Sequence, residues 1–156
     1  MQARKALKAV LGESGRPPEK RPVIGIFANA TGAKRYSTDW WRQFIDTLQT
    51  LCPDNCIVDL VAEHGQSQLG DRFATYYTRN LRRLAAVIAN MDGFISADCG
   101  VMHLAVASGT PTQGLFSTTC SGKYGPHGAN HTAIDTRTLG AADVATIAAD
   151  WLALRR

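Results

Sequence analysis

The sequence lacks several features that mark common classes of protein. No apolar run in it approaches the roughly 18 residues that a membrane-spanning helix needs, and its N-terminus has no apolar signal core. The four cysteines form no CxxC pair, which argues against structural zinc and a disulfide framework and favours reduced thiols. Internal repeats and low-complexity tracts are also absent. These absences predict a globular protein of the cytoplasm.

The composition is ordinary for one globular domain. The 156 residues are 45% hydrophobic and 19% charged, with a formal net charge of +4. A chain of this length buries enough apolar surface to fold without disulfides or metals. The basic excess is weak support for nucleic acid and fits an anionic small ligand or an anionic membrane surface equally well.

Strand and helix patterns alternate along the chain. Short apolar runs bounded by turn residues predict strands at 23–28, 56–62, 93–96, 112–116 and 132–135. Helical spacing of apolar residues predicts helices at 3–11, 38–51, 76–91 and 141–154, and one between Asp98 and Gly109. Ser37 or Thr38 is expected to cap the helix at 38–51, and the helix at 76–91 is expected to place Leu81 and Ile88 on one face.

This alternation predicts an α/β fold with a doubly wound parallel sheet. Right-handed crossovers would place helices on both of its faces. Gly and Pro in the segment 12–22 indicate a linker. We therefore expect an N-terminal helix and linker over residues 1–22, followed by a single Rossmann-like domain over 23–156.

Loops after three of these strands are expected to meet at the carboxyl edge of the sheet, where open α/β sheets bind ligands. The first, at 29–37, combines Gly32 with the hydroxyl of Thr31 and the cations Lys34 and Arg35. Such a set can receive a phosphate or a carboxylate, or it can be a solvated turn. It is neither a P-loop nor a dinucleotide fingerprint, because GxxxxGK[ST] and GxGxxG are both missing.

The second loop, Asp98 to His103, lies where a strand gives way to a helix. Asp98 can accept hydrogen bonds from sugar hydroxyls, or it can simply cap the helix. Gly100 lets a ligand approach the backbone closely, and the free N–H groups of a helix start suit a phosphate. His103 can donate to a phosphate oxygen or be an ordinary core residue. The third loop, 117–130, is rich in hydroxyls and is either functional or a surface loop.

Together these segments resemble the C-terminal half of glycosyltransferase family 9, the bacterial heptosyltransferases of lipopolysaccharide core synthesis. Three stretches carry the resemblance: ATGAKRYSTDWW at 30–41, ISADCGVMHLAVA at 95–107 and SGTPTQGLFSTTCSGKYGPHG at 108–128. The middle stretch follows the family pattern D-T-G-x-x-H-L-A-x-A, with Cys99 in place of Thr. The resemblance covers about residues 22–155. It implies half of a GT-B fold, in which two Rossmann-like domains enclose the active site.

The resemblance also implies roles for particular residues. Lys34, with Thr31 beside it, would contact the phosphate or sugar of a nucleotide-sugar donor. The diphosphate and sugar of an ADP-sugar, ADP-heptose above all, would be held by Asp98, Cys99, Gly100 and His103. Glu63 is the nearest candidate for the acidic residue that holds the ribose.

The family's acceptor domain and catalytic carboxylate lie in an N-terminal half that residues 1–22 do not supply. We therefore expect a donor-binding part of an inverting transferase that is inactive alone, its catalytic base lying elsewhere. The acceptor would be a lipid-linked sugar, bound through the missing domain at the inner face of the inner membrane, with peripheral membrane contact and no nucleic acid. No cofactor or metal is expected, since the sequence has no DxD pair.

Two other functions remain open from the sequence. One is a stand-alone nucleotide- or phosphate-binding module, which would bind a nucleotide and its sugar conjugate with equal affinity. The other is a non-enzymatic interaction domain, whose basic N-terminal helix and the face at 79–83 would meet a partner or a membrane. Its binding would weaken with added salt.

Overall fold

A parallel sheet forms the centre of the computed structural model, which describes residues 5–7, 9, 21–62, 65–118 and 130–155. Its six strands are β1 (Val23–Phe27), β2 (Cys56–Leu60), β3 (Ala74–Tyr76), β4 (Gly93–Ala97), β5 (Thr112–Phe116) and β6 (Thr132–Asp135). They lie in the order β3-β2-β1-β4-β5-β6, and every neighbouring pair is parallel. This order is that of a Rossmann fold, which confirms the expected doubly wound sheet.

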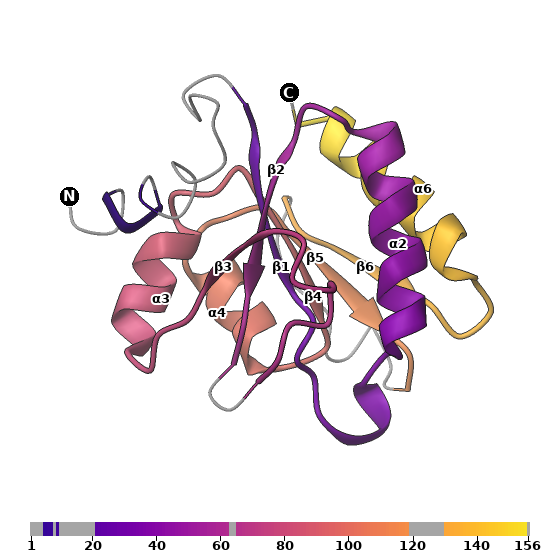
Figure 1. Ribbon diagram of the computed structural model, residues 1–156, viewed down its shortest axis with the longest axis horizontal. Coiled ribbons are helices and arrows are strands. Elements are labelled where there is room, and N and C mark those ends of the chain that lie inside the picture. The colour runs from indigo at the N-terminus through magenta and orange to yellow at the C-terminus, as the bar shows by residue number, and fades with distance from the viewer. Residues whose placement is uncertain (1–4, 8, 10–20, 63–64, 119–129, 156) are drawn as a thin grey trace.

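Helices cover both faces of the sheet. They are α2 (Thr38–Leu51), α3 (Leu81–Ile88), α4 (Gly100–Ala107) and α6 (Ala141–Ala153), with a short 3-10 turn, η2 (Gly32–Lys34), after β1. Helices α2 and α6 lie side by side on one face, and α3 and α4 lie on the other (Figure 1). Each face has its own buried apolar cluster. None of these described helices has the length and apolar composition needed to cross a bilayer.

Local sequence explains how α2 forms and packs. Ser37 is its N-cap, and the side chain accepts a hydrogen bond from the backbone N–H of Trp40 at 3.0 Å. The buried face of the helix consists of Trp41, Phe44, Ile45 and Leu48. Small residues on α6, such as Ala145 and Ala148, are fully buried and allow α2 to approach closely.

The predicted helix at 76–91 has the wrong boundaries. Tyr76 instead ends β3, which pairs with β2, and α3 begins only at Leu81. The side chain of Asn80 accepts a hydrogen bond from the N–H of Arg83 at 3.1 Å and so caps the helix start. Leu81 does not face the core, since it is 66% exposed. A strand of three residues is too short to show a period of two, so its sequence blends into the helix that follows.

Most of the expected N-terminal helix and linker lies outside the described residues. The described residues of this segment, 5–7 and 9, are helical. Leu7 is 5% exposed and belongs to the buried cluster on the α3–α4 face. Over these described residues the segment has an exposed side at Lys5 and a buried side at Leu7.

Candidate functional site

The strand order creates a switch point at the carboxyl ends of β1 and β4. From β1 the chain adds β2 and β3 on one side, then returns to place β4 on the other side of β1. The loops that follow β1 and β4 therefore leave the sheet in opposite directions. In open α/β sheets this divergence is where ligands bind. Two of the three predicted loops start here.

An ion pair joins these two loops. Nζ of Lys34, which follows β1, lies 3.1 Å from Oδ2 of Asp98, which follows β4. The carboxylate is buried, with 6% of its side chain exposed, while the lysine side chain is 41% exposed. A buried carboxylate with a partly exposed cation leaves part of the positive charge facing solvent. The pair therefore has a cation that a phosphate can approach.

The start of α4 is open beside this ion pair. Cys99, not Asp98, is the N-cap of the helix, and its side chain makes no capping hydrogen bond. The carboxylate of Asp98, one residue before this N-cap, contacts Lys34. Gly100 is exposed, and a Cβ built on it would meet no atom of the described residues within 4 Å. Among the described residues, the start of α4 at Gly100 thus borders open space, which suits anion binding at a helix start.

The remaining predicted residues have different positions. His103 is exposed one turn into α4, and Thr31 is exposed at the start of η2. The thiol of Cys99 is half-buried and lies 3.5 Å from the hydroxyl of Ser96. Glu63 and most of the third loop, 119–129, lie outside the described residues. Five predicted residues, Lys34, Asp98, Cys99, Gly100 and His103, thus belong to one ion pair and one helix start.

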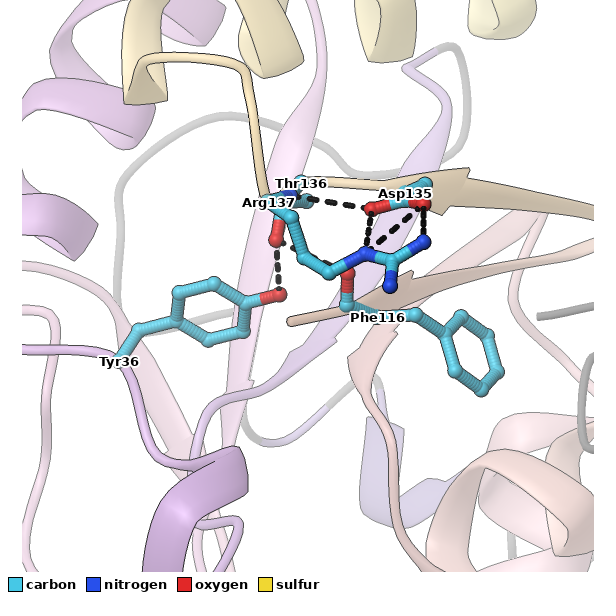
Figure 2. Close-up of polar contacts among 5 residues, drawn as sticks. All are labelled: Tyr36, Phe116, Asp135, Thr136 and Arg137. Atoms are coloured by element: carbon cyan, nitrogen blue, oxygen red, sulfur yellow. Dashed lines mark hydrogen bonds and ion pairs between the residues drawn. The ribbon is translucent and has the colours of Figure 1, made fainter. Parts of the chain in front are cut away.

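A buried hydroxyl relay, absent from the sequence prediction, lies at the same edge. The hydroxyls of Tyr36 and Thr136 are 2.7 Å apart, and Thr136 donates to the carbonyl of Phe116 at 3.1 Å (Figure 2). The one proton of Thr136 goes to that carbonyl, so Tyr36 is the donor to Thr136. Burial raises the pKa of Tyr36, which keeps its hydroxyl protonated. No local pattern links residues 100 positions apart.

An exposed ion pair lies next to this relay at the end of β6. The guanidinium of Arg137 contacts both carboxylate oxygens of Asp135, as Figure 2 shows. These hydrogen bonds, together with the backbone N–H of Arg137, lower the pKa of Asp135 to about 2. Because Asp135 stays ionised and paired at neutral pH, it is a poor candidate for proton transfer.

A cavity of about 650 Å³ lies beyond the carboxyl ends of β2 and β3. Its walls come from the segment after β2, from β3 and from the residues before α3. The lining residues are Val61, Ala62, Gly65, Gln66, Ser67, Asp71, Thr75, Tyr77 and Arg79. Its size suits a small ligand, and it offers amide, hydroxyl, aromatic and charged groups together. Nothing in the sequence indicated this cavity, because it depends on the unpredicted strand β3.

The first loop and this cavity are directly connected. The side-chain amide of Asn29, which follows β1, donates to the carbonyl of Gln66 at 3.0 Å and accepts from the N–H of Ala62 at 3.0 Å. Both partners line the cavity. The switch point and the cavity therefore form neighbouring parts of one edge. Within the described residues, no three His, Cys, Asp or Glu side chains gather as metal ligands would.

Comparison with known proteins identifies a family for this chain. The family model described as glycosyltransferase family 9 (heptosyltransferase) matches residues 2–146, so the match begins earlier than the resemblance found by reading the sequence. A comparison with proteins of curated function finds no match.

Solved structures share the fold. The heptosyltransferase WaaC of E. coli, solved with ADP, is 20% identical, with a TM-score of 0.71 over 93% of this chain and 48% of its own. A glycosyl transferase family 9 protein of Veillonella parvula is 15% identical, with a TM-score of 0.80 over 99% of this chain and 52% of its own. E. coli heptosyltransferase II is 16% identical, with a TM-score of 0.65 over 96% of this chain and 52% of its own.

This chain thus spans about half the length of these solved structures. The match extends from the N-terminal segment through the first turn of α6 and includes every strand of the sheet. The chain belongs to glycosyltransferase family 9, the heptosyltransferase family.

Proposed function

We propose that this chain is the donor-binding half of an inverting glycosyltransferase, and that its donor is a nucleotide-sugar of the ADP-heptose class. The observation that carries the proposal is the Lys34–Asp98 ion pair beside the open start of α4 at the switch point. Related proteins were solved with ADP and with ADP-heptose, which supports the choice of donor.

The diphosphate would lie between Lys34 and the first turn of α4. The lysine contributes a full charge, and the helix start contributes free N–H groups with the positive end of the helix dipole. Gly100 leaves room for a phosphate oxygen to reach the backbone. Asp98 orients the lysine, and His103 can donate to the outer phosphate or the sugar.

The nucleoside would lie in the cavity at the ends of β2 and β3. Its volume of about 650 Å³ is ample for a base and a ribose. Gln66 and Thr75 offer hydrogen bonds to polar edges, and Tyr77 offers a ring to stack against. Asn29 joins the two subsites, so one ligand can span both.

In the proposed reaction, the acceptor hydroxyl attacks the anomeric carbon while a carboxylate elsewhere in the enzyme takes its proton. The bond to the diphosphate breaks, and negative charge grows on the leaving ADP. Lys34 and the start of α4 would stabilise that charge as it develops. The acceptor is proposed to be a lipid-linked sugar of lipopolysaccharide core synthesis, met by a second domain at the cytoplasmic face of the inner membrane. No bound metal or other cofactor is proposed to take part.

Calorimetric titration of the chain with ADP, UDP and GDP tests the binding role. We expect selective binding of ADP, weakened at least about tenfold, or about 1.4 kcal/mol, in Lys34→Ala. Lys34→Arg should retain part of the affinity because it keeps the charge. Lys5→Ala is the matched control, since Lys5 is also an exposed cation but is next to Ala6 and Leu7 on the α3–α4 face.

Equal affinity for ADP and ADP-heptose, with Lys34→Ala still weakening both, would point instead to a stand-alone nucleotide-binding module. If none of the three nucleotides bound the wild-type chain, the proposed function would be wrong. Salt-sensitive binding to anionic vesicles in place of nucleotide would then favour the interaction domain.

A further inference from the structure

The cavity at the ends of β2 and β3 owes one wall to a short segment with an unusual backbone. This wall, residues 65–71, contributes Gly65, Gln66, Ser67 and Asp71 to the lining. Gly70 has φ +73° and Asp71 has φ +53°, so two successive residues adopt the left-handed conformation. That conformation is unfavourable for a residue with a Cβ, although Asp tolerates it better than most. Something must hold Asp71 in place.

The hydroxyl of Ser67 provides that hold. Its Oγ accepts hydrogen bonds from the backbone N–H groups of Leu69 at 3.2 Å and of Asp71 at 3.1 Å. The same hydroxyl donates to Oδ2 of Asp59 at 2.7 Å. A serine hydroxyl has one proton and two lone pairs, so all of its hydrogen-bonding capacity is used. Ser67 therefore fixes both the turn and the distance of the turn from the sheet.

Asp59, which holds Ser67 in place, is a buried carboxyl group whose burial costs stability. It lies on β2, is 2% exposed, and is surrounded on its face of the sheet by the apolar cluster that includes Ile57 and Leu69. Burial raises the pKa of its carboxyl, and nearby Asp71 raises it further, while the hydrogen bond from Ser67 lowers it. An ionised carboxylate at such a position costs stability compared with an apolar residue. Its presence is explained by what it holds, because Ser67 is the hydrogen-bond partner found for it among the described residues.

The other end of the wall is held from β1. Asn29 bonds to the backbone of Ala62 and Gln66. A Cβ on Gly65 would lie 2.8 Å from both the carbonyl oxygen of Ala62 and Oδ1 of Asn29. This close packing fixes the start of the wall, which leaves Ser67 to set the shape of its end.

We propose that Ser67, anchored by Asp59, is a positioning residue for the nucleoside half of the donor site: it shapes the wall of the cavity but is not itself required for the diphosphate contacts. This inference rests on the proposed function. It predicts that the two halves of the ligand respond differently when Ser67 is changed.

Calorimetric titration of the full chain with ADP and with inorganic pyrophosphate tests the proposal. Ser67→Ala should weaken ADP binding by about tenfold and leave the affinity for pyrophosphate unchanged. Ser67→Thr keeps the hydroxyl and should restore ADP affinity to within about threefold of wild type.

Ser108→Ala is the matched control. The hydroxyl of Ser108 also bonds to backbone, at 2.7 Å from the carbonyl of Leu104 in α4, and its removal should leave ADP affinity unchanged. Hydrogen exchange at the amides of Leu69 and Asp71 should quicken in Ser67→Ala alone.

A second variant separates a loss of ADP affinity from a loss of folding. Asp59→Val removes the anchor and the buried carboxyl group together, so the thermal midpoint should stay level or rise while ADP affinity falls. Unchanged ADP affinity in Ser67→Ala or in Asp59→Val would overturn the proposal while leaving the proposed function standing. Equal loss of ADP and pyrophosphate binding in Ser67→Ala would also overturn it, because the effect would then be general. A wild-type chain that binds neither ligand would overturn the proposed function and this inference with it.

Discussion

The two edges of the sheet use polar side chains differently. At the amino edge, side chains bind backbone: Oδ2 of Asp92 accepts from the N–H of Val23 at 2.7 Å, and Nδ1 of His131 accepts from the N–H of Thr112 at 3.2 Å. At the carboxyl edge, Lys34 pairs with Asp98, and Cys99, the N-cap of α4, makes no capping hydrogen bond with its side chain.

This difference separates stability from function. Groups at the amino edge satisfy backbone donors at the starts of strands, so removing them should reduce the free energy of unfolding. At the carboxyl edge a charge and a helix start border open space, an arrangement that adds little stability and suits a ligand. The contrast is incomplete, because Asn29 and Ser67 at the carboxyl edge also bind backbone, and there they shape the cavity.

The largest effect is expected at Gly100. Gly100→Ala should leave the thermal midpoint level or slightly higher, because a Cβ there meets no atom of the described part of the chain and alanine favours helix. ADP affinity should fall about thirtyfold, or about 2 kcal/mol, because the methyl group occupies the space proposed for a phosphate. Calorimetry and thermal unfolding together check both parts. Gly140→Ala is the control, since it adds a methyl group at the start of α6 with an ordinary 3.5 Å contact to Asp143. Unchanged ADP affinity in Gly100→Ala would remove the helix start from the proposed site.

Asp92 gives the matching test at the amino edge. Asp92→Ala leaves the N–H of Val23 without its acceptor, at a cost of about 1–2 kcal/mol. The thermal midpoint should drop by roughly 2–8 °C at this chain length, with ADP affinity unchanged. Asp92→Asn keeps an acceptor oxygen and should recover most of the loss. A fall in ADP affinity larger than the fall in stability would contradict the division between the edges.

Tyr36 tests whether the carboxyl edge also contains purely structural pairs. Tyr36→Phe removes the donor to Thr136 but keeps the ring that packs on Trp40 and Trp41. We expect a loss of about 1 kcal/mol in the free energy of unfolding and little change in ADP affinity. A double-mutant cycle with Thr136→Val measures the coupling directly by denaturant unfolding. A coupling energy near zero would show that the relay contributes nothing.

The smallest effect is expected from His131. Burial, followed by the charge of Arg155, lowers its pKa below the ordinary 6.5. Between the unfolded pKa of about 6.5 and the lowered pKa of the folded state, the unfolded chain binds more protons than the folded one. The free energy of unfolding is therefore highest above about pH 6.5 and declines as the pH falls from there to the lowered pKa. Thermal midpoints measured from about pH 8 to pH 5 should show this decline in the wild type. His131→Gln keeps an acceptor for Thr112 without titrating, and should remove that part of the decline.

Much of the fold could be predicted from local patterns. The helix at 38–51 follows from a serine cap and a stripe of large apolar residues, both of which the structure contains. The strand at Gly93–Ala97 and the helix after it follow from an apolar run that breaks at Asp98. Strand β3 escaped prediction because three residues carry too little periodicity. The exposure of Leu81 escaped it because Asn80 starts the helix later than its apolar residues suggest.

The candidate site was partly predictable for the same reason. Asp98, Gly100 and His103 lie within six residues of sequence at a strand-to-helix boundary, so their neighbourhood is local. The Lys34–Asp98 ion pair and the Tyr36–Thr136 relay instead join segments that are distant in the sequence. The cavity requires β2 and β3 to be neighbours in the sheet. Such contacts depend on the order of strands in the sheet, which local patterns do not specify.

The sequence by itself determined the alternation of strands and helices and the placing of polar loops at the carboxyl ends of strands. Both arise from short-range physics: the period of buried residues, helix caps, and the residues that break regular structure. The tertiary structure alone decided the order β3-β2-β1-β4-β5-β6, the Lys34–Asp98 pair and the wall set by Ser67. These features depend on which strands pack together, and that choice is made by the burial of the whole apolar surface at once.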